Sequence, residues 1–343
     1  MPGIDLKNSR ILITGGTGTF GKAFVKKILY NYKIKRLVVF SRDEFKQYEM
    51  SKKFPTSKYP CMRYFIGDVR DKDRLNQAFD NIDIVIHAAA LKQVDTAEYN
   101  PFEYISTNIM GAENVIRASL NNNIKQVIAL STDKAASPIN LYGATKLCSD
   151  KLFIAANNIT GSKKIKFSVV RYGNVLGSRG SVVPMFLSLN GKEFPVTDKR
   201  MTRFNITIDQ AVNFVLTCMK HSFGGEIFVP KIPSYRIIDV VKAINPSCKI
   251  KTIGIRPGEK LHEEMITLSD GFNSLELKNF FVILPRLNLS KNYNKTQNEY
   301  VLKNYYLKKK KAKRLPENFS YNSRNNPKYL SIKEIKKIIK DNF

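Results

Sequence analysis

The sequence predicts an α/β fold: a doubly wound parallel sheet of the Rossmann type with a smaller mixed α/β unit that binds substrate. Two observations carry this prediction. Short apolar runs rich in β-branched residues alternate with amphipathic stretches, a pattern typical of βαβ units whose parallel sheet is covered on both faces. A glycine-rich turn, TGGTGTFG, joins the first apolar run to the first amphipathic stretch, which is where dinucleotide-binding folds place such a turn.

The predicted strands and helices follow one another in order. The expected strands are RILITGG, KRLVVF, RYFIG, DIVIHAA, KQVIALS and SVVRYGN. Helices are expected over FGKAFVKKILYNY, over residues 44–53, 72–79 and 99–121, from Tyr142 onward, and over LSIKEIKKII near the end. Residues 1–173, with a return at about 206–230, are predicted to form the dinucleotide-binding domain, and residues 174–205 and 231–343 the substrate-binding domain.

Length and composition limit the class of protein. With 343 residues, 43% of them hydrophobic and 25% charged, the chain has the composition of a globular protein with a large core. No apolar run approaches the roughly 18 to 20 residues that span a bilayer, and the N-terminus leads into a strand rather than a signal peptide. We therefore expect a soluble, cytoplasmic protein with no membrane partner. The cysteines and histidines have no metal-binding spacing, so no metal site is expected.

The net charge of +28 suits nucleic acid, an acidic membrane face or anionic substrates alike. Much of this charge is lysine on predicted solvated faces. The basic run from Lys308 to Lys311 lacks the interleaved aromatic residues of a base-stacking platform. We expect no nucleic-acid partner, and the alternative predicts salt-sensitive retention on RNA without substrate turnover.

The glycine-rich turn holds Gly15, Gly18 and Gly21, where the backbone must approach a pyrophosphate at the positive end of a helix. Asp68, after the third strand, is placed where a carboxylate could meet an adenine amine, although it also suits an ordinary loop start. Residues 88–90 are three alanines after the fourth strand. Their small side chains would let a flat cofactor pass, and ordinary helix packing would accept them too.

The end of the second strand suggests which dinucleotide binds. An NAD site usually has an acidic residue here, but this chain has Ser41 and Arg42, with Lys46 one helical turn later. Two cations suit a 2′-phosphate, so NADP is favoured over NAD. The alternative is a surface arginine beside a helix cap at Asp43.

The stretch STDKAASPINLYGATK holds the candidate catalytic residues. Tyr142 and Lys146 share one helix face, and a nearby ammonium would lower the pKa of the phenol from about 10 and make it a usable base. Such a pair takes a proton from a hydroxyl as hydride leaves for a nicotinamide. Thr132 follows the fifth strand, and Asp133 and Lys134 form an additional acid and base pair.

These features resemble the extended short-chain dehydrogenase/reductase superfamily and, more narrowly, its inverting UDP-N-acetylglucosamine 4,6-dehydratases, which begin pseudaminic acid synthesis in bacteria that glycosylate flagellin. The resemblance runs from about residue 10 to the C-terminus. The segments that carry it are ILITGGTGTFGKAF, FSRDEFKQYEM, HAAALKQV, LSTDKAASPINLYGATK, VVRYGNVLGSRGSVVP, MTRF and IRPGEKLHEEM.

The resemblance implies a role for each catalytic candidate. Tyr142 would oxidise C4 of the sugar, with Lys146 orienting it and Thr132 bonding the C4 oxygen. Asp133 would protonate the departing C6 hydroxyl, and Lys134 would remove the C5 proton. The product would be UDP-2-acetamido-2,6-dideoxy-β-L-arabino-hex-4-ulose, made with tightly bound, recycled NADP by a homo-oligomer, either a hexamer or a dimer.

The resemblance also implies two sets of binding residues. The predicted cofactor contacts are Gly15, Thr17, Gly18, Thr19, Phe20, Gly21, Ser41, Arg42, Lys46, Asp68, Val69, Ala88, Ala89, Ala90, Lys92, Asn108, Tyr142, Lys146 and Tyr172. The predicted substrate contacts are Lys92, Asn174, Val182, Thr202, Arg203, Arg256 and Glu259. Guanidinium groups suit bidentate contact with a pyrophosphate, and surface ion pairs are the alternative for both arginines.

Chemistry separates the dehydratase from its rivals. Loss of water from C5 and C6 needs an acid and a base, whereas C4 epimerisation needs only the tyrosine. Lys134 can be a base only when neutral, so we expect its pKa to fall from about 10.4 to about 7.4, a cost of roughly 4 kcal/mol; burial, Lys146 and the nicotinamide ring would supply it. A local ion pair is the alternative for Asp133 and Lys134.

Three rival functions remain. The first two are a UDP-sugar C4 epimerase and a retaining 4,6-dehydratase, and the lysine at position 134 argues against both. The third is a non-catalytic NADP-binding regulator. Such proteins usually lose the tyrosine or its lysine, and this chain keeps both.

Overall fold

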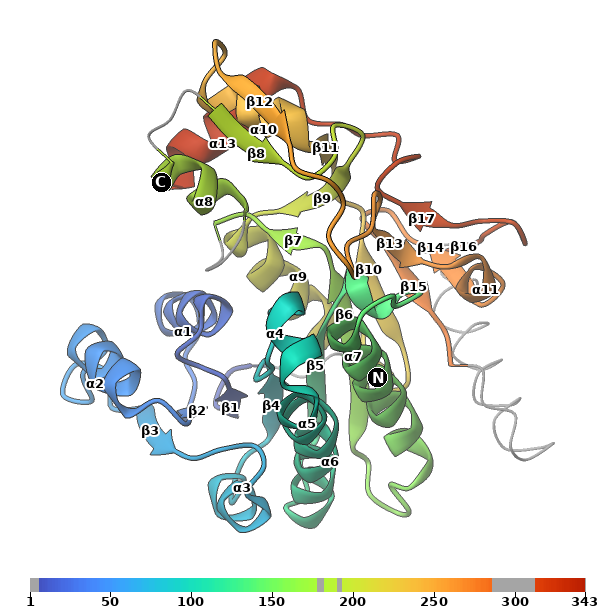
Figure 1. Cartoon of the computed structure of the whole chain (residues 1–343). Coiled ribbons are helices and arrows are strands. Elements are labelled where there is room, and N and C mark those ends of the chain that lie inside the picture. The colour runs from blue at the N-terminus through green and yellow to red at the C-terminus, as the bar shows by residue number, and fades with distance from the viewer. Residues whose placement is uncertain (1–5, 178–181, 190–192, 286–311, 343) are drawn as a thin grey trace.

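The computed structural model describes residues 6–177, 182–189, 193–285 and 312–342. A large sheet lies at its centre (Figure 1). In their order across the sheet, the strands are β16 (Lys313–Arg314), β14 (Ser274–Glu276), β15 (Phe280–Ile283), β10 (Ile227–Pro230), β6 (Lys166–Tyr172), β5 (Gln126–Thr132), β4 (Ile84–His87), β1 (Arg10–Thr14), β2 (Arg36–Ser41) and β3 (Met62–Ile66). The strands from β3 to β10 run parallel, and β15, β14 and β16 extend the sheet antiparallel.

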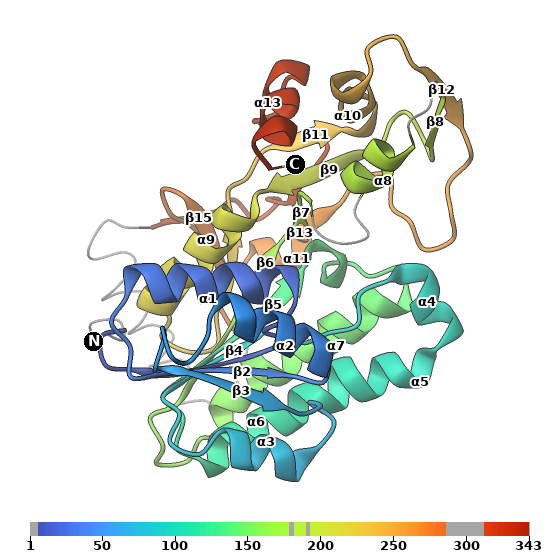
Figure 2. The same cartoon turned by 90° about the vertical axis from the view of Figure 1, so that its left-hand side faces the viewer.

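Helices cover both faces of the sheet (Figure 2). Helices α1 (Thr19–Asn31) and α9 (Ile208–His221) pack together on one face. On the other face lie α3 (Lys72–Ala78), α6 (Gly111–Asn121) and α7 (Leu141–Ala155). Helix α2 (Glu44–Lys53) follows β2. The predicted doubly wound α/β fold is confirmed.

One predicted helix is interrupted. The sequence predicts a continuous helix over residues 99–121, but α4 (Val94–Tyr99) ends where that helix was to begin, and Pro101 opens α5 (Pro101–Tyr104). Proline suits the first position of a helix because it has no N–H to donate. A π-helical turn, η1 (Ile105–Met110), then joins α5 to α6, and such turns often occur at functional sites.

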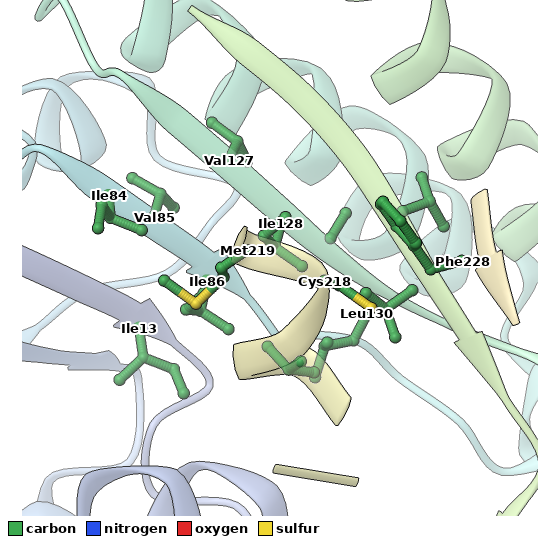
Figure 3. Close-up of a cluster of buried hydrophobic side chains, with 14 of the residues drawn as sticks. Ile13, Ile84, Val85, Ile86, Val127, Ile128, Leu130, Cys218, Met219 and Phe228 are labelled. Atoms are coloured by element: carbon green, nitrogen blue, oxygen red, sulfur yellow. The ribbon is translucent and has the colours of Figure 1, made fainter. Parts of the chain in front are cut away.

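The main core lies between the sheet and its helices. Cys218 and Met219 of α9 point toward apolar side chains of β4 and β5, including Ile86 and Ile128 (Figure 3). Each of these four side chains is at most 2% exposed. Burial of such apolar surface stabilises a fold by about 25 cal/mol per Å², so α9 is a fixed part of the large sheet's unit.

A second, smaller core lies at the carboxyl end of the sheet (Figure 1). It is built from α8 (Val182–Ser188), β8 (Glu193–Val196), β11 (Ser234–Arg236), α10 (Ile237–Ile244), β12 (Lys249–Thr252) and α13 (Ile332–Asn342). Strand β9 (Thr202–Ile206) pairs with β11, and its Phe204 and Ile206 belong to the main core. Four short elements lie between the two cores: η2 (Asp133–Ala135), β7 (Asn174–Val175), β13 (Glu264–Ile266) and β17 (Tyr321–Asn322).

The path of the chain differs from the predicted domain division in one respect. Strand β10 joins the large sheet, and helix α9 packs on it. Strands β14, β15 and β16 also join the large sheet, although the sequence assigns residues 231–343 to the second domain. An apolar run signals a buried strand, but it does not say which sheet the strand joins.

Within the described ranges, no helix has the length and apolarity to cross a bilayer, and no three His, Cys, Asp or Glu side chains gather as a metal site. All four cysteines lie in these ranges and are free thiols. The basic run at residues 308–311 lies outside the described residues.

Candidate active site

The glycine-rich turn joins β1 to α1. The turn contains Gly15, Thr17, Gly18, Thr19, Phe20 and Gly21. Gly15 has a φ of 64°, and a Cβ there would lie 2.9 Å from the Cα of Ala89, so only glycine fits. Helix α1 begins after Gly18 without a side-chain cap and without an acidic residue in its first turn. Its free N–H groups and positive dipole suit a pyrophosphate.

Arg42 and Asp68 follow the neighbouring strands β2 and β3. The Nη1 of Arg42 lies 3.7 Å from the Oδ2 of Asp68, and the Arg42 side chain is 54% exposed. Asp68 also accepts a hydrogen bond of 2.8 Å from Arg70. Burial would raise the pKa of Asp68, but the hydrogen bonds and charge of Arg70 outweigh it and lower the pKa. Asp68 is therefore a carboxylate at neutral pH, and Arg42 is left exposed beside it.

Lys46 and Asp43 form an ion pair at the start of α2. The Oδ1 of Asp43 also accepts a hydrogen bond of 2.9 Å from the backbone N–H of Lys46 and so caps the helix. Ser41 is buried and accepts a hydrogen bond of 3.0 Å from Gln47. The predicted helix cap and the predicted pair of cations are thus both present at this strand end.

The loop after β4 is held by Asn108 of the π-helical turn. The Oδ1 of Asn108 accepts from the N–H of Leu91 (2.9 Å), and its Nδ2 donates to the Leu91 carbonyl (3.0 Å) and to Thr145 (3.0 Å). Asn108, a predicted cofactor contact, therefore fixes residues 88–92 against α7. In this loop, burial and the charge of Lys134 lower the pKa of Lys92, which places Lys92 within electrostatic reach of the catalytic candidates.

Helix α7 presents Tyr142, Lys146 and Asp150 on one face at intervals of four residues. Asn140 caps the helix by accepting a hydrogen bond of 2.7 Å from the N–H of Gly143. Lys146 donates 2.8 Å to the carbonyl of Leu130 on β5. The capped helix thus fixes these side chains against the carboxyl end of the sheet.

The pKa of Tyr142 does not follow the prediction. Burial raises the pKa of this phenol to about 12. Lys134 exerts the main opposing charge, not Lys146, because Lys146 points to the β5 carbonyl. The expectation that Lys146 lowers this pKa below 10 was wrong.

Thr132, Asp133 and Lys134 lie together at the end of β5. The hydroxyl of Thr132 donates 2.9 Å to Asp133 Oδ1. The Nζ of Lys134 lies 3.1 Å from Asp133 Oδ1 and 3.3 Å from Glu263 Oε1. It also donates 3.3 Å to the Oδ1 of Asn174 on β7. The ammonium is therefore held by two carboxylates and an amide.

These contacts overturn the expected pKa of Lys134. Burial lowers this pKa, but the charges of Asp133 and Glu263 outweigh burial and hold it above the ordinary value of 10.5. The predicted fall to about 7.4 is therefore wrong, because the prediction did not include the carboxylate of Glu263. Burial raises the pKa of Asp133, and the charge of Glu263 adds to that rise, as an acid requires.

Arg203 contacts this cluster, and the Arg256–Glu259 turn contacts the start of α7. The Nε of Arg203 lies 3.6 Å from Glu263 Oε1. Glu259 donates its N–H to the Arg256 carbonyl (3.1 Å), and the carbonyl of Gly258 accepts 2.8 Å from Asn140. The turn is thus docked at the start of α7.

Two predicted contacts, Thr202 and Val182, lie apart from the cluster, and a third, Tyr172, lies beside it. The Oγ1 of Thr202 lies 2.8 Å from the Nδ1 of His262 and lines a cavity of about 330 Å³. Successive strand residues point to opposite faces, so Thr202 faces away from the side of Arg203. Val182 packs on the second core. Tyr172 pairs in register with Thr132 across β5 and β6, and burial raises its pKa.

Sequence reasoning missed Glu263. The motif LHEEM was part of the resemblance, but no role was given to either of its glutamates. Two successive carboxylates after a predicted pyrophosphate-binding arginine were the available signal. Alternation along the chain sends Glu263 toward Lys134, whereas Glu264 accepts a hydrogen bond of 3.0 Å from Ser137.

The sequence profile described as polysaccharide biosynthesis protein matches residues 11–285, which is most of the chain. The protein belongs to this family. A relative from Campylobacter jejuni subsp. jejuni serotype O:2, named UDP-N-acetylglucosamine 4,6-dehydratase (inverting), is 53% identical over 332 residues, which are 96% of each chain. The resemblance inferred from the sequence is therefore confirmed.

Two further similarities bear on the family. A relative from Rickettsia bellii, named UDP-glucose 4-epimerase, is 39% identical over 96% of this chain and 94% of its own. The solved structure of Pen from Bacillus thuringiensis matches with a TM-score of 0.85 and 37% identity, over 98% of this chain and 99% of that one. Family members thus include proteins with different named activities, so the site chemistry has to distinguish them.

Proposed function

We propose that this protein is a UDP-N-acetylglucosamine 4,6-dehydratase that inverts C5. The observation that carries the proposal is the pair of buried Asp133 and half-buried Lys134 beside Tyr142. The name and 53% identity of the Campylobacter relative support the same activity. The named epimerase relative is the rival, but an epimerase has no step that uses an acid at position 133.

Each catalytic candidate has one task in the proposed reaction. Tyr142 takes the proton of the C4 hydroxyl, and Thr132 bonds the same oxygen. Lys134 removes the C5 proton once C4 is a ketone, which acidifies that position. Asp133, whose pKa is raised by burial, gives its proton to the departing C6 hydroxyl. Lys146 supports the ribose beside the nicotinamide.

The residues of the first unit fit a nicotinamide dinucleotide. The uncapped start of α1 suits its pyrophosphate, and the small residues 88–90 leave room for its ribose and ring. When bound, the dinucleotide supplies oxidation at C4 and the later reduction at C6. We infer NADP, tightly held and recycled, because Arg42 directly follows β2 and Lys46 lies in the first turn of α2.

Arg42→Ala is expected to weaken NADP binding by about tenfold to a hundredfold while NAD binding changes little, because a charge-assisted contact to the 2′-phosphate is worth about 1.5 to 3 kcal/mol. Titration of each dinucleotide into protein stripped of cofactor measures both affinities. Arg117→Ala is the matched control, since Arg117 is an exposed arginine that pairs with Glu113 on α6. Equal weakening of NAD and NADP would contradict the preference.

NMR tests the activity directly. Protein incubated with UDP-N-acetylglucosamine in deuterated water, without added cofactor, is expected to give a 6-deoxy methyl signal and deuterium at an inverted C5. That result also requires a cofactor that stays bound and is recycled. Formation of a C4 epimer that keeps its C6 hydroxyl would contradict the dehydratase function and favour an epimerase.

We infer that the enzyme acts in the cytoplasm, at the first step of pseudaminic acid or a related 6-deoxy-sugar synthesis. We also infer that it is a homo-oligomer, either a hexamer or a dimer. Exposed apolar side chains along α4, α5 and η1 support self-association, because monomers rarely expose contiguous apolar patches. Tyr99 is 87% exposed, Phe102 80% and Met110 45%.

A further inference from the structure

Glu263 is fixed in place directly before β13. Its N–H donates 2.8 Å to the Oγ of Ser323, and its carbonyl accepts 2.7 Å from the Ser323 N–H. The residue is 3% exposed. A buried carboxylate held this firmly by its backbone has little freedom to turn away from its neighbours, so its side-chain contacts are a stable feature of the site.

The two oxygens of the Glu263 carboxylate have different surroundings. Oε1 lies 3.3 Å from the Nζ of Lys134 and 3.6 Å from the Nε of Arg203. Oε2 is buried and has no hydrogen-bond partner among the described residues. A buried carboxylate oxygen without a donor is costly and rare, and a role in the chemistry is one reason for its retention.

The proposed function has a difficulty that this carboxylate resolves. The C5 base must be a neutral amine, but Lys134 rests as an ammonium whose Nζ lies 3.3 Å from the Oε1 of the Glu263 carboxylate. Asp133 cannot remove the surplus proton, since it must itself be protonated to release the C6 hydroxyl. Glu263 is then the only other carboxylate in contact with Lys134 among the described residues.

We propose that Glu263 takes the surplus proton from Lys134 before C5 is deprotonated, and so lets a lysine that rests as an ammonium serve as the base. This role rests on the proposed dehydratase function. Because Glu263 acts through Lys134, it is a positioning residue that sets the protonation state of the base.

The protons balance through the elimination. Lys134 first gives a proton to Glu263, which leaves an amine beside a neutral acid. The amine takes the C5 proton, the C5 electrons form the double bond to C6, and the C6–O bond breaks. The leaving oxygen takes the proton of Asp133 and departs as water. A proton that then passes from Glu263 through Lys134 to Asp133 restores the starting charges.

The charges around Glu263 fit a transient proton. Lys134 and Asp133 face it from η2, Arg203 from β9, and Lys260 from the preceding turn. Burial raises the pKa of Glu263, but the charges of Lys134, Arg203 and Lys260 outweigh burial and lower it. At rest Glu263 is therefore ionised. The proton therefore rests on Lys134, and the state in which Glu263 holds it is a minor, transient one.

Glu263→Gln separates this role from simple charge support. Glutamine keeps the shape but accepts no proton, so dehydration is expected to slow about a hundredfold. Lys134 must then lose its proton to solvent, so the turnover rate of the variant should rise with pH through the neutral range. The turnover rate of the wild type should not change with pH over that range. Oxidation at C4, followed by the absorbance of reduced nicotinamide in a single turnover, should be unchanged because it precedes this step.

A different result is expected if Glu263 has no role in moving protons. If Glu263 only stabilised the ammonium, its removal would lower the pKa of Lys134 and supply more free amine, and Glu263→Gln would match or exceed the wild-type rate. That result would overturn the proposal. A second result would also overturn the proposal. If Glu263→Gln lost C4 oxidation as well as dehydration, and Glu263→Asp recovered neither, the role of Glu263 would be structural.

Two variants and the wild type complete the test. Glu263→Asp keeps a carboxylate and should recover part of the lost rate and the level pH profile. Glu264→Gln changes the adjacent carboxylate, which contacts Ser137, and should behave as the wild type. A wild type that forms no 6-deoxy product would overturn the proposed function itself, and this role with it.

Discussion

Lys134→Ala is expected to abolish dehydration while the protein still binds its cofactor. The variant removes the proposed C5 base, whose loss costs about 10²- to 10⁴-fold in rate. It also leaves the buried carboxylates of Asp133 and Glu263 without the ammonium that lies 3.1 Å and 3.3 Å from them. The buried Glu263 carboxylate then lacks its nearest cation and should take up a proton more readily.

The measurement is the rate of 6-deoxy product formation by NMR, with bound dinucleotide quantified in the same preparation. Lys151→Ala is the control, because Lys151 lies on the exposed face of the same helix α7. If Lys134→Ala dehydrates the substrate at the wild-type rate, Lys134 is not the C5 base and Glu263 does not relay its proton. An inactive variant without bound cofactor would instead point to a collapsed site.

Asp150→Ala is expected to destabilise the whole fold, by up to about 3 to 5 kcal/mol, because it removes the nearer carboxylate from a buried guanidinium. Asp270, whose Oδ2 lies 3.6 Å from the Nη1 of Arg171, remains as a more distant, partly exposed partner. The Nη2 of Arg171 lies 3.1 Å from Asp150 Oδ2, and both side chains are 2% exposed. Ser131 donates 2.8 Å to the same oxygen. The pair ties α7 to β6 directly beneath the catalytic face, so loss of stability and loss of turnover should appear together.

Denaturant unfolding measures the change in the free energy of unfolding, provided that the bound dinucleotide is held at one concentration. Asp209→Ala, at an exposed position on α9, is the control and should change stability little. The double variant Asp150→Leu with Arg171→Met should be more stable than Asp150→Ala, since replacing both partners leaves no buried charge. A loss below about 1 kcal/mol in Asp150→Ala would contradict the assigned role of the pair.

The sequence by itself determined the features that depend on short stretches of chain. The glycine turn was readable because Gly15 must adopt a positive φ. Helix α2 was predicted with its observed bounds of Glu44–Lys53, since its cap and its polar pattern are local. The placement of Tyr142 and Lys146 on one face followed from helical periodicity alone.

The tertiary structure decided what depends on contacts between distant stretches. Glu263 lies more than a hundred positions from Lys134 in the sequence, yet its oxygen is 3.3 Å from the ammonium, and it reverses the expected shift of that pKa. The strand that carries Thr202 turns its hydroxyl to His262 rather than to the catalytic face. Coulomb energy changes steeply over a few ångströms inside a protein, and no local pattern specifies distances of that kind. The sequence therefore determined which groups are available for the chemistry, and the fold determined which of them hold the protons.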